Sequence, residues 1–215
     1  GSVHAILERD TRRMIAYSSV AQIGYIYMGI GLGTQAGMVA AIFHMFTHSA
    51  TKALLFISAV GLYEVSKDQK DFRSLQGSGY RNPLAGIGFT VGALSMVGFP
   101  MLSGFISKLL FATSALQSPH KMLPTVIALA ISTILNAVYF LRLVITLYTI
   151  PEESSENKRE EPANEEEIPK RRPVLSAGTW KLHLAIVSFI LLNPTLGLYS
   201  QPVVAWIGSG LAMFD

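Results

Sequence analysis

Long apolar runs separated by short charged clusters dominate this chain of 215 residues. The charged residues gather at 8–13, 64–81 and 152–181, and the stretches between these clusters are nearly free of charge. Uncharged apolar runs of about 18 residues or more are typical of membrane-spanning helices. The pattern therefore predicts an all-α, polytopic transmembrane helix bundle.

The runs predict about five spans and the tail of a preceding one. Residues 1–149 form the predicted bundle, with spans at 14–33, 36–63, 84–117 and 122–149. Residues 150–182 carry many glutamates and then KRR, with almost no apolar content to bury, so a flexible charged loop is predicted there. A terminal transmembrane helix is predicted at 183–215, although Asn193-Pro194 interrupts its apolar pattern.

The stretch 84–117 is too long for one straight membrane helix. Its residues would run about 51 Å at 1.5 Å per residue, and the hydrocarbon core is only about 30 Å thick. The segment GFPMLSG at 98–104 contains Pro100 between Gly98 and Gly104, and proline removes a backbone donor and disfavours helix at the preceding residue. We therefore predict one helix broken at these three residues, with its freed backbone buried or lining a wet cavity.

The basic residues predict the orientation of the bundle. If 84–117 is one interrupted pass, the loops at 8–13, 64–83 and 150–182 share one side and hold 13 of the 17 Lys and Arg. Positive loops remain on the cytoplasmic side. Lys52, Lys108 and Arg142 are left in or near the membrane, where we expect Arg142 to extend toward the interface.

The composition excludes several kinds of function. Only 14% of the residues are charged and 50% are hydrophobic, and there is no cysteine. Disulfides, cysteine-ligated iron–sulfur clusters and thiol catalysis are therefore excluded. A Gly-rich phosphate loop, a zinc spacing and a nucleophile triad are also missing, so no cofactor on this chain and no nucleic-acid partner are expected.

Three titratable side chains recur every four residues in HMFTHSATKALLF at 44–56. His44, His48 and Lys52 form a row along one helix face. A lysine near the centre of a span costs about 2.5–3.5 kcal/mol and must face other helices or water. Such a row can pass a proton along, with water between its members and a hydroxyl from Thr47 beside it. The alternative is that these groups only hydrogen-bond helices together.

Further polar residues extend this picture. Lys108 follows the helix break, where it can exchange protons with one side of the membrane. Ser18, Ser19 and Gln22 lie near the cytoplasmic end of the first span and provide possible polar lining or helix packing. The spans between 14 and 149 contain no Asp or Glu, so the lysines lack an acidic partner on this chain. The two histidines have metal-like spacing, but no acidic third ligand is in view and no metal site is predicted.

Three motifs in order carry a resemblance to a known family. DTRRMIAYSSVAQIGY, HMFTHSATKALLF and GFPMLSGFISK resemble the antiporter-like membrane subunits of respiratory complex I, a family that includes subunits of Mrp-type sodium/proton antiporters and of membrane-bound hydrogenases. The resemblance covers residues 8 to about 149. It implies a fold of about fourteen helices with two five-helix inverted repeats. This chain resembles the second repeat without its first helix, plus one terminal helix, as a C-terminal fragment would.

The resemblance also implies roles for individual residues. A lysine matching Lys52 belongs to the central polar axis, and one matching Lys108 lies in the broken helix and serves the outer half-channel. His44 and His48 match histidines beside the axis in some members. The glutamate and lysine pair of the family's first repeat has no counterpart here.

The function implied is proton translocation, as one subunit of a complex I-like NADH-quinone oxidoreductase in a bacterial or archaeal inner (plasma) membrane. The expected partners are other membrane subunits, the lipid bilayer and protons, with no redox site on this chain. Three alternatives remain open: Na⁺/H⁺ exchange in an Mrp-type antiporter, proton or sodium pumping in a membrane-bound hydrogenase, and a purely structural membrane subunit.

Overall fold

A computed structural model describes residues 1–150 and 179–213, and over these residues the chain forms a bundle of α-helices with no β-strand. The predicted loop at 150–182 falls largely outside the described residues. The helices are α1 (Ser2–Leu7), α2 (Thr11–Gly31), α3 (Gln35–Glu64), α4 (Ser78–Arg81), α5 (Pro83–Val97), α6 (Ser103–Ala115), α7 (Pro119–Tyr148), α8 (Thr179–Leu198) and α9 (Ser200–Leu211).

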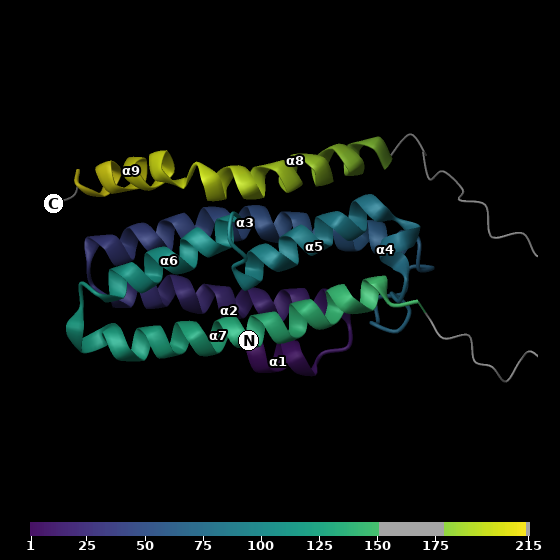
Figure 1. Ribbon diagram of the computed structural model, residues 1–215, viewed down its shortest axis with the longest axis horizontal. Coiled ribbons are helices and arrows are strands. Elements are labelled where there is room, and N and C mark those ends of the chain that lie inside the picture. Colours follow the sequence, from purple (N-terminus) through teal and green to yellow (C-terminus); the bar gives the residue numbers. More distant parts are fainter. Residues whose placement is uncertain (151–178, 214–215) are drawn as a thin grey trace, which may run out of the picture.

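The long helices lie side by side, with α3 at the centre of the bundle (Figure 1). Helix α3 packs against α2, α5, α6, α8 and α9. Its apolar side chains meet those of α5 and α7 in the main core, where Leu54, Phe89 and Phe140 are fully buried. The inner face of α3 is therefore covered by neighbouring helices.

Local sequence signals fix where the helices begin. The side chain of Asp10 accepts a hydrogen bond from the Arg13 amide at the start of α2, and Thr34 does the same for the Gly37 amide at the start of α3. Asn82 caps α5, with Pro83 in its first turn. These are the residue types that satisfy the free amides of a helix N-terminus.

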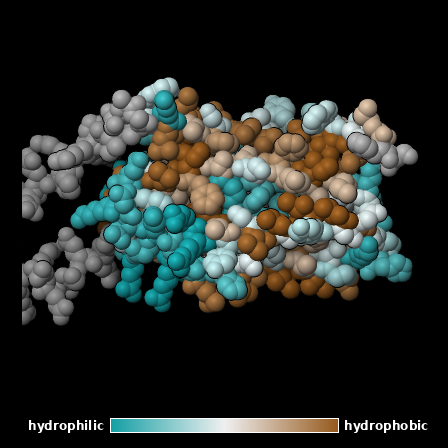
Figure 2. All heavy atoms as spheres, turned by 180° about the vertical axis from the view of Figure 1, so that it is seen from behind, coloured by the Kyte–Doolittle hydropathy of each residue, from teal (hydrophilic) through white to brown (hydrophobic). Residues whose placement is uncertain are grey.

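The lengths and hydropathy of the helices are those of a membrane protein. Three described helical segments are long and apolar enough to cross a bilayer: α3, α7 and 180–198 of α8. Helices α5 and α6 form the two halves of the interrupted pass. Figure 2 shows apolar side chains over the middle of the molecule and hydrophilic ones gathered at one end. The predicted all-α transmembrane bundle with one broken helix is confirmed.

The break between α5 and α6 occupies residues 98–102. Gly98 has a φ of +95° and its amide bonds back to Leu94 and Ser95, which ends α5. Met101 also has a positive φ, of +73°, which is a strained conformation for a residue with a side chain. A Cβ added to Gly104 would lie 1.8 Å from the Ser95 carbonyl oxygen, so α6 can start against α5 only because residue 104 is glycine.

The terminal segment differs from its predicted form. Its helix begins at Thr179, before the predicted 183, and runs through Asn193-Pro194 without a break. The interruption comes instead at Tyr199, after which α9 continues to Leu211. A proline inside a membrane helix is tolerated where neighbouring helices support the backbone, and here α8 packs against α3, α5 and α6.

Candidate functional site

The predicted row of titratable groups lies on the inner face of α3. The rings of His44 and His48 stack with their centroids 5.9 Å apart and 15° between their planes. His44 is 5% exposed and Lys52 is 7% exposed, whereas His48 is half-buried. Helical geometry thus places three adjacent titratable side chains along the centre of the bundle.

Lys52 is held by α2. Its Nζ donates a hydrogen bond to the backbone oxygen of Ile15 over 2.7 Å and another to the hydroxyl of Ser18. The ring of Phe140 from α7 lies 5.9 Å from the same nitrogen. Ser19 donates to the Ile15 oxygen as well, over 3.3 Å, so its hydroxyl serves its own helix. The partners of Lys52 within the described residues are therefore neutral oxygens.

Lys108 lies at the helix break. Its Nζ donates to the backbone oxygens of Met96, over 2.7 Å, and Val97, over 2.5 Å. These are among the last carbonyls of α5, where the helix dipole is negative and the oxygens have no partner within the helix. Lys108 thus closes the C-terminal end of the half-helix that precedes it.

A small cavity lies between Lys108 and the two histidines of the α3 row. Its volume is about 10 Å³, close to the room that one water molecule needs. Nδ1 of His44 is 2.6 Å from the hydroxyl of Ser107, the residue before Lys108. The residues that line the cavity come from α2, α3, α5 and α6: Gln22, His44, Thr47, His48, Thr51, Ser95, Met96, Gly104 and Lys108.

Several buried polar atoms in the interior of the bundle have no hydrogen-bond partner within the described part of the chain. They are Nε2 of Gln22, the hydroxyl of Tyr25, Nε2 of His44, Nδ1 of His48 and Nδ2 of Asn136. A buried polar group without a hydrogen-bond partner lowers the stability of the fold by about 1–3 kcal/mol. Buried water is the usual partner of such groups. The arrangement therefore favours a hydrated interior.

A second polar cluster connects α8 to the break. The side-chain oxygen of Asn193 accepts from Thr51 over 2.8 Å and from Ser103 over 3.1 Å. Ser95 lies 3.3 Å from Ser103 and 3.4 Å from Thr51. The four side chains come from α3, α5, α6 and α8, so this cluster fixes the position of the break relative to the centre of the bundle.

The structure brings most of the predicted site residues together and adds others. Gln22, Thr47, Gly104 and Lys108 line the cavity with the two histidines, while Lys52 and Ser18 are hydrogen-bonded to each other outside its lining. Gly98 and Pro100 lie in the break, and Ser19 turns to its own helix. Within the ranges that the structure describes, no group of three or more His, Cys, Asp or Glu is placed to hold a metal ion.

The sequence pattern does not single out the serines and threonine of the second cluster, nor Ser107 and Asn193. It marks Asn193 only as part of an interruption in the terminal span. The signal that marks it is an amide side chain in an apolar span, because such a group needs a partner inside the bundle. Its partners Thr51 and Ser103 could not be named from the sequence because they lie on two other helices.

These observations define the class of protein: a helical membrane bundle with a buried lysine at its centre and a half-buried lysine at a helix break. The chain belongs to the family described as NADH:quinone oxidoreductase/Mrp antiporter, transmembrane, whose model matches residues 1–135.

Relatives and solved structures agree with this membership. The chain is 37% identical over 150 residues to NADH-quinone oxidoreductase subunit N of Desulforudis audaxviator, a match covering 69% of this chain and 29% of that protein. Its fold is similar to a chain of the Mrp complex from Dietzia sp., with a TM-score of 0.76 and 24% identity over 96% of this chain and 43% of the other. A chain of an archaeal membrane-bound sulfane sulfur reductase gives a TM-score of 0.73 and 26% identity, covering 97% and 39%. The chain thus spans less than half the length of these proteins.

Proposed function

We propose that this chain moves protons through a hydrated path formed by Lys52, His48, His44 and Lys108, as one part of an ion-translocating membrane complex. The observation that carries the proposal is the shared cavity, which holds both histidines of the α3 row and the lysine of the helix break. The membrane subunits named among its relatives support a role beside other subunits.

The proposed path has a lysine at each end. At one end, Lys108 faces the carbonyls of Met96 and Val97 at the break. At the other, Lys52 faces the Ile15 carbonyl and Ser18. His44 and His48 lie between them, and each has a ring nitrogen without a partner within the described residues. A water molecule in the cavity can connect these nitrogens to Lys108, since hydrogen-bonded water relays protons between groups too far apart for direct contact.

Charge provides a means of coupling. No acidic side chain lies in the spans between 14 and 149, so a proton on one lysine is repelled by a proton on the next group of the row. A charge change in a neighbouring subunit then shifts the balance among them. The energy comes from such a partner, and the bundle lies in a bacterial or archaeal plasma membrane with its basic end in the cytoplasm.

Substitution of each lysine in the full-length subunit, within its assembled complex in sealed vesicles, tests the proposal. We expect Lys52→Met and Lys108→Met each to leave assembly intact and to lower the rate of pH-gradient formation by about tenfold or more, because each removes a proton carrier. Lys121→Met is the matched control: Lys121 also donates to helix-end carbonyls, with Nζ 2.8 Å from the Gly31 oxygen, but lies away from the cavity.

Each alternative predicts a different result. Purely structural lysines predict that Lys52→Met reduces the amount of assembled complex more than the transport rate per complex. Sodium/proton exchange predicts that the pH gradient fails to form in sodium-free medium. Unchanged pumping by both assembled variants, or an equal loss in Lys121→Met, contradicts the proposed path.

A further inference from the structure

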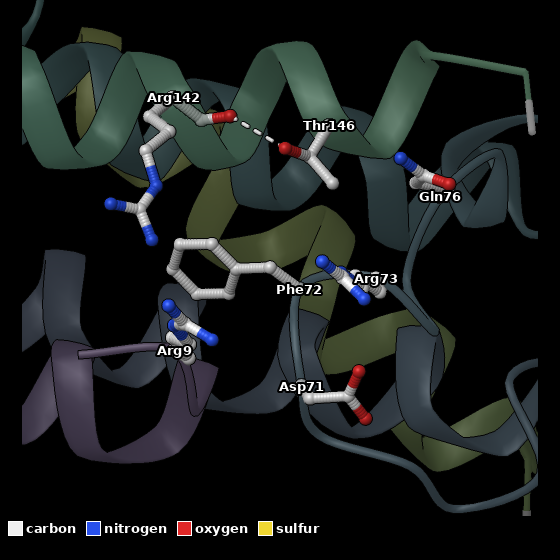
Figure 3. Close-up of a pocket in the computed structure, with 7 residues that line it drawn as sticks. All are labelled: Arg9, Asp71, Phe72, Arg73, Gln76, Arg142 and Thr146. Atoms are coloured by element: carbon white, nitrogen blue, oxygen red, sulfur yellow. Dashed lines mark hydrogen bonds between the residues drawn. The ribbon is translucent and has the colours of Figure 1, made fainter.

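A second pocket lies at the basic end of the bundle, apart from the proton path. It has a volume of about 500 Å³ and opens between the α1–α2 connection, the loop at 71–76 and α7. Figure 3 shows three guanidinium groups around the ring of Phe72: Arg142 from α7, Arg9 from the α1–α2 connection and Arg73 from the loop. Pockets of about 300–1,000 Å³ are the size that holds small ligands.

The backbone holds these arginines in place. The amide of Phe72 donates to the Arg9 oxygen over 3.1 Å, and the amide of Thr11 donates to the Lys70 oxygen over 2.9 Å. These two bonds join the α1–α2 connection to the loop. The convergence of Arg9 and Arg73 on one pocket is therefore built into the fold.

Arg142 is fixed from several sides. Its guanidinium lies 4.6 Å from the centre of the Phe72 ring and donates to the backbone oxygens of Ile6, over 3.0 Å, and Glu8, over 3.1 Å. The expected extension of Arg142 toward the interface thus takes the form of a bridge to the end of α1. A guanidinium has five N–H donors, so donors remain for a ligand in the pocket.

The positive charge of the pocket is not neutralised by the described residues. Asp71 is its only acidic lining residue in that part of the chain. Its carboxylate accepts hydrogen bonds from the hydroxyl and the amide of Ser74, which lower its pKa, and forms no ion pair with the arginines. Three converging guanidinium groups repel one another, and an anion bound among them relieves that repulsion.

We propose that this pocket binds the phosphate of an anionic phospholipid headgroup. Guanidinium groups form paired, charge-assisted hydrogen bonds with phosphate oxygens, and basic pockets between helices at the cytoplasmic side suit lipid headgroups. The position favours a lipid over a free phosphate, because α7 leads from Arg142 into the membrane with exposed apolar side chains. Val138 is 48% exposed and Ile134 is 63% exposed, and they offer a surface for acyl chains. The proposal does not depend on the proton path.

The test uses the assembled complex in phosphatidylcholine nanodiscs, with spin-labelled phosphatidylglycerol as the probe. We expect Arg9→Gln/Arg73→Gln to weaken retention of the probe about tenfold or more, because the variant loses charge-assisted hydrogen bonds to the phosphate. Arg12→Gln/Arg13→Gln removes the same charge from the same end of the bundle but outside the pocket, and we expect a change within about twofold. Arg9→Lys/Arg73→Lys keeps the charge but loses the paired guanidinium donors, so we expect a loss of binding that is smaller than in the glutamine variant.

The contrary outcomes are distinct. Equal losses in the two glutamine variants would show a diffuse surface charge effect and overturn the proposal. Inorganic phosphate that displaces the probe, when a chloride control of the same ionic strength does not, supports phosphate recognition. Wild-type complex that binds inorganic phosphate but retains phosphatidylglycerol no better than phosphatidylcholine would overturn the lipid assignment.

Discussion

Gly98 stands where α5 ends and Lys108 turns back onto it, and replacing it with alanine perturbs both features. Its φ of +95° is unfavourable for a residue with a Cβ, at a cost of about 1–2 kcal/mol. An added Cβ would also lie 3.0 Å from Cδ and 3.1 Å from Nζ of Lys108, so the lysine must move by a few tenths of an ångström.

That displacement weakens the bonds of Lys108 to the Met96 and Val97 oxygens. A hydrogen bond that involves a charged group contributes about 1.5–3 kcal/mol, and a partial loss is expected here. With the backbone term, Gly98→Ala should lower the free energy of unfolding by about 2–4 kcal/mol. The same variant should also slow pH-gradient formation, because Lys108 no longer faces the cavity in its original position.

The assay is denaturant unfolding of the purified subunit in detergent, followed by helical circular dichroism, with pumping measured in vesicles. Gly208→Ala is the matched control. Gly208 lies within α9 with nothing within 4 Å of an added Cβ, so alanine there should be neutral or stabilising by up to about 1 kcal/mol. If Gly98→Ala is as stable as Gly208→Ala and pumps normally, the reasoning about the half-helix end is refuted.

Two further predictions concern the rest of the bundle. Asn193→Ala should lower the free energy of unfolding by about 1–3 kcal/mol, because it removes the side-chain oxygen that accepts from the buried hydroxyl of Ser103. As a control, Thr195→Ala at an exposed position of the same helix should change the free energy of unfolding by less than about 0.5 kcal/mol. Equal effects of the two variants in denaturant unfolding would contradict the role of the polar cluster. The Ser74 bonds lower the pKa of Asp71, so their stabilisation of the loop is fully present above the ordinary value of 3.8 and is lost as the pH falls below it. The protection factor of the Ser74 amide in hydrogen exchange should fall over that window in wild type but show no such step in Asp71→Asn.

The sequence pattern predicted what depends on the order of residues along one helix. The spacing of His44, His48 and Lys52 sufficed to place them on one face, since helical periodicity is set by the backbone alone. Pro100 with its flanking glycines marked the break for the same kind of local reason. These features needed no knowledge of which helices become neighbours.

Contacts between helices were beyond that reasoning. The pairing of His44 with Ser107, and of Asn193 with Thr51, joins residues far apart in the chain. Such pairings follow from the crossing of packed helices, which one sequence does not specify. The continuation of α8 through Pro194 was missed for the same reason, because the neighbouring helices that support its backbone could not be identified.

The side-chain nitrogen of Lys108 has two roles, one proposed and one seen in the structure. The atom that would carry a transported proton is also the atom that holds the free carbonyls of α5. Loss of its proton removes a positive charge from the negative end of a helix, which frees the break to rearrange. In the proposed path, the protonation state of this one lysine would therefore also set how firmly α6 is held against the end of α5.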